Sequence, residues 1–127
     1  MSRPPSGARG RGASRLFVVA AGRGATAALA ASKGFGIRAL VALSPRVEGT
    51  ERNAPPPEET RAPKLIIVGS LDDGAAADAE TVFHRSIGWA LLNSTPVTEQ
   101  GTALLSSSWG TNVREQITAF LLDYLFL

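Results

Sequence analysis

Residues 16–31 read LFVVAAGRGATAALAA, an apolar run that leads through a glycine-rich turn into an alanine-rich segment. The run at 16–21 is apolar and partly β-branched, which is typical of a short buried strand. Gly22 and Gly24 supply the turn, and small side chains over 25–33 predict a helix that is closed by Gly34. A strand followed at once by a helix opens a βαβ unit, so this stretch decides the fold class.

The next two strands continue the alternation. Residues 37–43 (IRALVAL) are apolar almost throughout and predict a second strand, which ends at Ser44. Residues 64–68 (KLIIV) predict a third strand, and a helix that ends at Gly88 follows over 76–87. The side chains expected to share the apolar face of this helix are Ala79, Val82, Phe83, Ser86 and Ile87.

The C-terminal third of the chain completes the pattern. Residues 89–93 (WALLN) predict a weaker fourth strand, and residues 103–105 a short apolar turn. Asn112 and Glu115 resemble the capping pair that starts a helix. The apolar stripe expected along this terminal helix consists of Val113, Ile117, Phe120, Leu121 and Tyr124.

Strands that are apolar almost throughout and alternate with helices indicate a parallel sheet covered on both faces. We therefore predict an α/β fold, a three-layer sandwich of about four mainly parallel strands with helices on both faces. In such sheets, ligands bind beyond the carboxyl ends of the strands. The segments expected to meet there are the turn at 20–24, Ser44-Pro45, the loop at 69–74 and the stretch 96–101.

The overall composition limits the classes of protein. The chain has 127 residues, enough for one domain, and no cysteine, which excludes disulfides, thiolate metal sites and thiol nucleophiles. No apolar stretch approaches the roughly 20 residues that span a bilayer. We therefore expect a cytoplasmic protein without a membrane segment.

The basic charge of the chain is concentrated at its start. Residues 1–47 carry eight Arg or Lys and no acid, whereas residues 48–127 carry five basic and eleven acidic side chains. Residues 1–15 contain almost no apolar side chains, so we predict a disordered basic leader before a folded domain at 16–127. A nucleic-acid-binding arm and a targeting peptide are alternatives. The leader has no aromatic side chain for stacking on bases, which disfavours nucleic acid.

Four motifs, taken in order, resemble the carboxyl-terminal half of the α/β-hydrolase family. Residues 20–24 (AAGRG) fall on the G-x-S-x-G nucleophile elbow, and 37–45 (IRALVALSP) is similar to the strand that follows it. Gly69 and Asp72 match the strand end that carries the acid, and 98–105 (TEQGTALL) matches the loop that carries H-G-x-x-L-L. The resemblance extends from residue 16 to the C-terminus and implies a hydrolase-like fold.

Two of the three catalytic positions of that family are substituted. Gly22 stands at the serine position, Gln100 at the histidine position, and Asp72 or its neighbour Asp73 at the position of the acid. The mechanism needs a hydroxyl nucleophile and an imidazole base, but glycine has no side chain and a neutral amide is not a base. The two acids also fit carboxylates placed before a helix N-terminus, where negative charge is favoured. The resemblance therefore implies a catalytically inactive domain.

A further deficit concerns the oxyanion hole. In the α/β-hydrolase family, one of its N–H donors comes from a loop after the third strand of the complete sheet. This sequence begins after the position of that loop, and loss of one such donor costs about 3 kcal/mol of transition-state stabilisation. We therefore expect a truncated domain.

Other side chains offer weaker candidates for chemistry. The remaining hydroxyl nucleophiles are Thr26, Ser44, Ser70 and the serines at 106–108. Each needs an activating base. The single histidine, His84, is expected on the solvent side of its helix, and Lys64 begins a strand at the end opposite the site. Arg23 and the N–H of Gly24, at the start of the first helix, could contact an anion.

We thus expect an α/β-hydrolase-like remnant or pseudoenzyme that acts, if at all, by binding, with no cofactor and no metal. Its first strand leaves a sheet edge that the full fold covers, and an open edge invites pairing with a second copy or a partner chain. Two alternatives stay open. One is an ester or amide hydrolase that completes its site with another nucleophile or chain, and the other is a nucleic-acid binder that uses residues 1–15.

Overall fold

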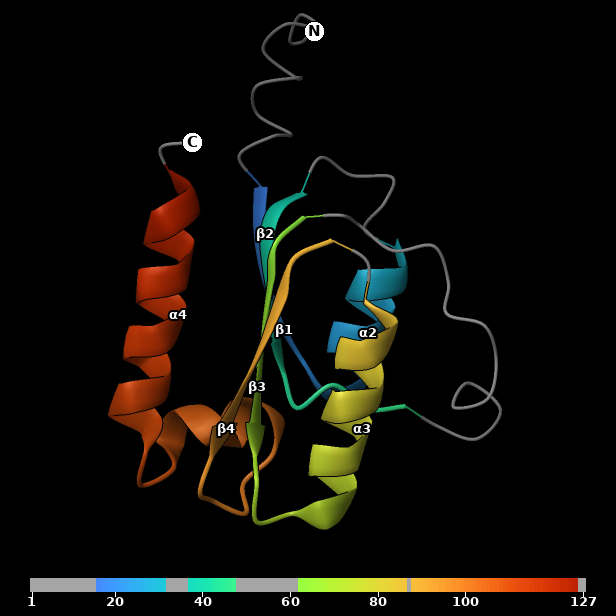
Figure 1. Ribbon diagram of the computed structural model, residues 1–127. Helices are drawn as coiled ribbons and strands as arrows, with labels where there is room; N and C mark the ends of the chain where they lie inside the picture. Colours follow the sequence, from blue (N-terminus) through green and yellow to red (C-terminus); the bar gives the residue numbers. More distant parts are fainter. Residues whose placement is uncertain (1–15, 32–36, 48–61, 87, 126–127) are drawn as a thin grey trace, which may run out of the picture.

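The chain folds around one parallel sheet, as the sequence predicts (Figure 1). The structure is a computed structural model that describes residues 16–31, 37–47, 62–86 and 88–125, so the leader predicted at 1–15 lies outside the described residues. The strands are β1 (Leu16–Ala21), β2 (Ile37–Leu43), β3 (Lys64–Gly69) and β4 (Ala90–Thr95). They lie side by side in the order of the chain, and each neighbouring pair is parallel.

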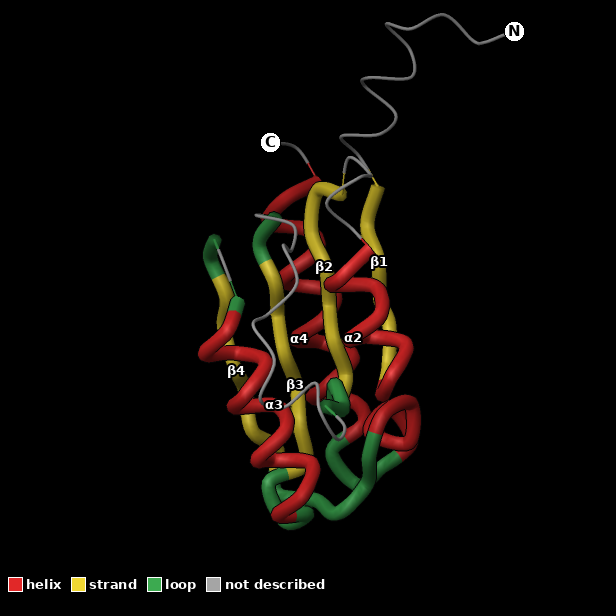
Figure 2. Tube along the Cα trace, turned by 90° about the vertical axis from the view of Figure 1, so that its right-hand side faces the viewer, coloured by secondary structure: helices red, strands yellow, loops and turns green. Residues whose placement is uncertain are grey.

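Helices cover both faces of the sheet. The helices are α2 (Gly22–Ala31), α3 (Asp73–Arg85) and α4 (Gly110–Leu125), with a short 3₁₀ helix, η3 (Gly101–Ser106), before α4. On one face, α2 packs over β1 and β2 while α3 packs over β3 and β4, as Figure 2 shows. The other face carries α4, which packs mainly on β2 and β3. The predicted three-layer α/β architecture is confirmed.

Each face has its own apolar core, because successive residues of a strand point to opposite sides. Leu40, Ile66 and Val82 belong to the core beneath α2 and α3. Val41 and Ile67 belong to the core beneath α4, where the predicted stripe of that helix packs. Of this stripe Val113 and Phe120 are buried, and the rest is half-buried against the same core.

The helices begin earlier than the sequence patterns predict. The first helix starts at Gly22 instead of residue 25, and the next starts at Asp73 instead of residue 76. Side-chain capping accounts for the second shift, because Asp72 caps α3 by accepting from the N–H of Ala75 at 3.0 Å. The predicted cap at Gly34 and the helical position of Ile87 lie outside the described residues.

The C-terminal end of α3 and the start of α4 also differ from the predictions. The C-cap of α3 is Ser86, and Gly88 lies beyond it with a positive φ of 75°. The terminal helix starts at Gly110, so Asn112 is already helical and the predicted pair with Glu115 is wrong as a cap. Instead, the Oδ1 of Asn112 accepts from Gln116 at 2.6 Å, one turn further along the helix. A polar residue near a helix start therefore marks the region of the start without fixing the cap position.

The first strand has the predicted bounds but is not buried. It lies at the edge of the sheet, where Leu16 is 43% and Val19 is 49% exposed. By contrast, every residue of β3 is buried. The prediction of a buried strand at 16–21 is therefore wrong, since apolar composition alone does not tell an edge strand from a central one.

Candidate functional site

The turn between β1 and α2 places Gly22 at the carboxyl edge of the sheet. Gly22 has a φ of +58°, a left-handed conformation that a residue with a Cβ adopts only at a cost. A Cβ built on Gly22 would meet no atom within 4 Å, so the position has room for a side chain. The carbonyl oxygen of Gly22 accepts from the backbone N–H of Arg46 at 3.3 Å.

The loop after β3 places Asp72 at the same edge, immediately before α3. One carboxylate oxygen of Asp72 caps the helix, and the other accepts a short hydrogen bond from the Nε2 of Gln100. The hydrogen bond from the N–H of Ala75 is the main cause of a lowered pKa for the Asp72 carboxyl, and the bond from Gln100 and the charge of Arg46 act in the same direction. Asp73 is the exposed first residue of the helix, so of the two acids it is Asp72 that contacts Gln100.

The loop before η3 brings Gln100 into the site. Its Nε2 donates to Asp72, while its Oε1 accepts from the Nη1 of Arg46 at 2.6 Å. The two partners fix the orientation of the amide, because a carboxylate only accepts and a guanidinium only donates. The next residue, Gly101, lies against β1, since a Cβ on it would be 3.6 Å from the Cβ of Ala21. Both ends of the Gln100 amide are therefore committed, and neither can act as a base.

Arg46 joins all these segments. Its backbone N–H contacts Gly22, its backbone carbonyl accepts from the Oγ1 of Thr26 at 2.7 Å, and its guanidinium reaches Gln100. The Nε of Arg46 also pairs with the carboxylate of Asp78 at 2.9 Å. Arg46 is thus the centre of the network, and the sequence pattern did not indicate this role.

Asp78 is a second residue of this network that was not predicted from the sequence. Its side chain is only 1% exposed, and its Oδ2 accepts from both the Nε of Arg46 and the N–H of Val47. The signal was present, because Asp78 lies on the helix face that also carries Ala75, Ala79 and Val82 at i, i+3, i+4 and i+7 spacing. A carboxylate on an apolar stripe needs a charged or donating partner.

Most of the hydroxyl groups considered as alternative nucleophiles are engaged or enclosed, whereas Ser108 is exposed. The side chains of Thr26, Ser70, Ser106 and Ser107 each donate to a backbone carbonyl. Ser44 is fully buried. No contact in the described part of the chain joins any of these hydroxyls to an imidazole or an amine.

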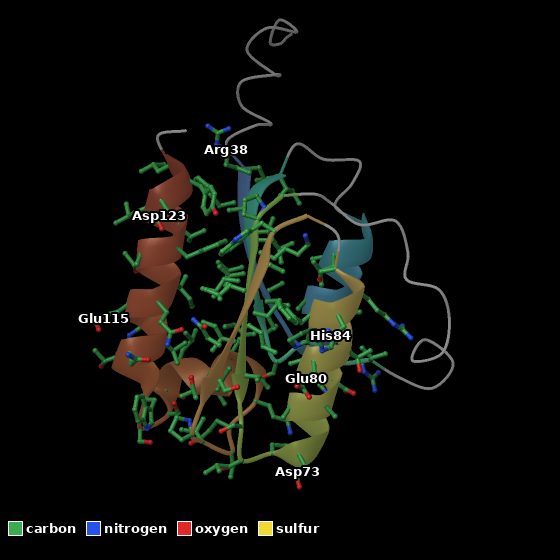
Figure 3. The ribbon with its side chains drawn as sticks, viewed as in Figure 1. Arg38, Asp73, Glu80, His84, Glu115 and Asp123 are labelled. Atoms are coloured by element: carbon green, nitrogen blue, oxygen red, sulfur yellow. The ribbon has the colours of Figure 1, made fainter. Side chains whose placement is uncertain are left out.

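The two candidate bases lie away from the site. His84 is exposed near the C-terminal end of α3, whereas Asp73 begins that helix at the carboxyl edge of the sheet (Figure 3). The expected solvent position of His84 is confirmed. Lys64 begins β3 at the opposite end of the strand and is fully buried, with its Nζ donating to the carbonyl of Ala62 at 3.1 Å.

The predicted anion contact involves the first turn of α2. Arg23 and Gly24 are both exposed there, and the first turn contains no acidic residue. Within the described ranges, no group of three or more His, Asp or Glu residues is arranged to hold a metal ion, and no helix is long and apolar enough to cross a membrane. The anion contact therefore stays a prediction.

Comparison with known proteins adds no relative to this picture. No family model, no curated protein and no solved structure matches the chain. The chemistry of the site is therefore judged from its own groups. These are a glycine without a side chain, an amide bonded at both ends, and an arginine bonded to a buried carboxylate and to that amide. This set holds three loops together, and it has no hydroxyl or imidazole at the positions matched to serine and histidine.

Proposed function

We propose that this chain is a noncatalytic α/β-hydrolase-like domain that acts by binding. The observation that carries the proposal is the network in which Arg46 joins Gly22 and Gln100, and Gln100 joins Asp72. Three segments far apart in the sequence, those that match the serine, histidine and acid positions of the family, thus meet at one edge of the sheet. This meeting supports the resemblance, because a catalytic triad requires its three positions to adjoin.

The groups at these positions support binding over acyl transfer. Asp72 caps a helix and holds an amide, so its charge stabilises the fold in place of an imidazolium. The arginine is paired with a buried carboxylate. The surface left for function is then the rest of the molecule, of which the open edge of β1 is the part best suited to a partner chain.

The proposal is tested with the purified full chain and a fluorophosphonate probe that labels activated serines. We expect no labelling, and no turnover of p-nitrophenyl acetate above that of the heat-denatured protein. Stoichiometric labelling, or turnover that the probe abolishes, would overturn the proposal and favour an active hydrolase.

A double variant sharpens the same test. Gly22→Ser combined with Gln100→His restores the two missing groups, and the space around residue 22 admits the new side chain. We still expect little esterase activity, because Arg46 contacts the side chain at position 100, and its positive charge disfavours the protonated imidazole that forms during acyl transfer. Robust turnover by the double variant, but not by Gly22→Ser alone, would contradict this expectation.

A further inference from the structure

The two edges of the sheet are protected to different extents. At the β4 edge, Trp89 stacks on Phe120 with ring centroids 6.2 Å apart, and the Nδ2 of Asn93 donates to Gln116 at 2.7 Å. These contacts tie β4 to α4, while α3 covers its other face. At the opposite edge, β1 packs under α2 on one face, and on the other face it lies at the margin of the core beneath α4, where its residues are only partly buried.

The width of α4 explains why part of β1 stays exposed on the face that this helix covers. Strands are spaced about 4.8 Å apart and a helix is about 10 Å wide, so one helix covers roughly two strands. Since α4 packs mainly on β2 and β3, it covers the same face of β1 only in part: Phe17 and Ala21 pack against the core beneath α4, whereas Val19 between them is 49% exposed. Val19 points to this face, because its register partner Val41 belongs to the core beneath α4. Val19 thus lies near the middle of the edge strand, and its side chain is half-exposed.

The edge of β1 also lacks the features that usually keep two edges apart. Natural edge strands carry charges, prolines or bulges in their middle. The six residues of β1 (LFVVAA) include no charge and no proline, and the register irregularity lies at its start, between Leu16 and Phe17. Among the described residues, β2 alone pairs with β1. A second uncharged copy of the strand would meet no like charge across the pair.

We propose that β1 pairs antiparallel with β1 of a second copy of this chain, about a two-fold axis at Val19. The proposal builds on the noncatalytic binding function and names its partner. A two-fold axis perpendicular to the sheet makes the interface isologous and joins the two sheets into one. It also keeps both copies of α4 on the same side of the combined sheet.

The side chains of β1 select this register. Residues directly opposite each other in an antiparallel pair share a face, so Val19 can oppose only a residue that also points to the α4 side. With Val19 opposite Val19 of the second copy, Phe17 opposes Ala21 and Val18 opposes Ala20. Each large side chain thus meets a small one, because β1 runs from large residues at its start to small ones at its end. A register centred on Val18 would instead place Phe17 against Val19.

The pairing is small, so the dimer is expected to be weak. A strand pair of this length buries less than the roughly 800 Å² per partner of a standard interface. Sedimentation velocity of the full chain from about 10 µM to about 500 µM is therefore expected to show a concentration-dependent monomer–dimer equilibrium. A single monomeric species over the whole range would overturn the proposal.

Matched variants locate the interface. Val19→Lys places a charge next to the same charge across the two-fold axis, and we expect it to lower the association constant at least about tenfold. Leu91→Lys is the control, since Leu91 is a similarly exposed residue (41%) on the other edge strand. We expect the control to associate like the unaltered chain. Loss of the dimer in Leu91→Lys but not in Val19→Lys would overturn the proposal.

Introduced cysteines test the register, because the chain has none of its own. Directly opposite residues lie about 4.5–5.5 Å apart between Cα atoms, within the range of a disulfide. Val19→Cys should therefore form a disulfide dimer on oxidation. Val18→Cys and Ala20→Cys should crosslink when mixed and far more slowly when separate. Faster crosslinking of Val18→Cys alone than of Val19→Cys would overturn the Val19-centred register.

The same samples separate this proposal from the proposed function. Probe labelling and ester turnover are measured on the unaltered chain and on Val19→Lys. A monomeric protein without activity would overturn the dimer and leave the noncatalytic function standing. A dimer that turns over ester would overturn the noncatalytic function and leave the dimer standing.

Discussion

Two strands of this sheet, β1 and β3, look alike in sequence and differ in burial. Both have six residues, both are largely apolar, and both run into a helix at their carboxyl end. Yet β3 is buried along its whole length, while β1 is half-exposed. The difference comes from position in the sheet, since β3 has neighbours on both sides and helices on both faces. Hydrophobicity thus establishes that a segment is a strand, and packing establishes where it lies.

The largest expected loss of stability follows from shortening a side chain in the middle of β3, compared with the same change in the middle of β1. Ile66→Ala in β3 removes a fully buried side chain from the core beneath α2 and α3, so we expect the free energy of unfolding to fall by about 3–4 kcal/mol. Val19→Ala in β1 should cost less than about 1 kcal/mol, because Val19 is half-exposed. Urea unfolding at low protein concentration, where the monomer dominates, measures both. Equal losses would contradict the comparison.

The glycines at the carboxyl ends of the two strands are required for different reasons, and at Gly69 the reason is lack of space. A Cβ on Gly69, at the end of β3, would lie 2.6 Å from the carbonyl oxygen of Val97 and 2.7 Å from that of Glu99. Both atoms are backbone, so Gly69→Ala must displace the loop that carries Gln100, at a cost of about 2–3 kcal/mol. The urea midpoint measures the loss. The side-chain NMR signals of Gln100 should shift as well, and an unshifted Gln100 would show that the loop stays in place.

The glycine after β1 has space but a strained backbone. Gly22→Ala meets no atom within 4 Å, yet a φ of +58° costs an alanine about 1–2 kcal/mol. Gly24→Ala is a matched control two residues away, because that position also has open space but no positive φ. We expect the control to raise the free energy of unfolding by about 0.5–1 kcal/mol, as Gly→Ala does in a helix. The midpoint of thermal unfolding should thus fall in Gly22→Ala and rise in Gly24→Ala.

The smallest effect concerns pH and the loop after β3. Hydrogen bonds lower the pKa of Asp72 in the folded chain, so its carboxylate stabilises the fold above the ordinary aspartate pKa of about 3.9. That contribution is lost as pH falls through the lowered pKa. Asp72→Asn keeps a good capping residue but no ionisable group, so it should match the unaltered chain near pH 2 and be less stable at pH 7, which flattens the acid side of the stability profile. Urea midpoints between pH 2 and pH 7 test this, and parallel profiles would contradict it.

The sequence allowed the elements and their order to be predicted, because apolar runs between turn residues are local signals. The bounds of β1 and β2 are those predicted, and β3 is one residue longer. The helices begin at Gly22 and Asp73, three residues before the predicted starts at 25 and 76. Glycine and aspartate disfavour helix interiors, but both are accepted in the first turn.

The site could be predicted only in part. The segments carrying Gly22, Asp72 and Gln100 were expected at one edge of the sheet, and there they lie. Arg46 was missed because a loop arginine looks solvated until the fold places a buried carboxylate beside it. Its partner Asp78 comes from a helix 32 residues away. The edge position of β1 was expected from the family resemblance, but the sequence pattern of the strand itself did not reveal it.

The sequential order of the four strands has a consequence for synthesis on the ribosome. Each strand pairs with the one made just before it, so the sheet can grow in the direction of translation without waiting for a distant partner. The second face is closed later, by η3 and α4, which follow all four strands in the chain. Until both have been made, Val41 and Ile67 stay uncovered, so the nascent sheet is most open to chaperone capture and misassembly in the interval between β4 and α4.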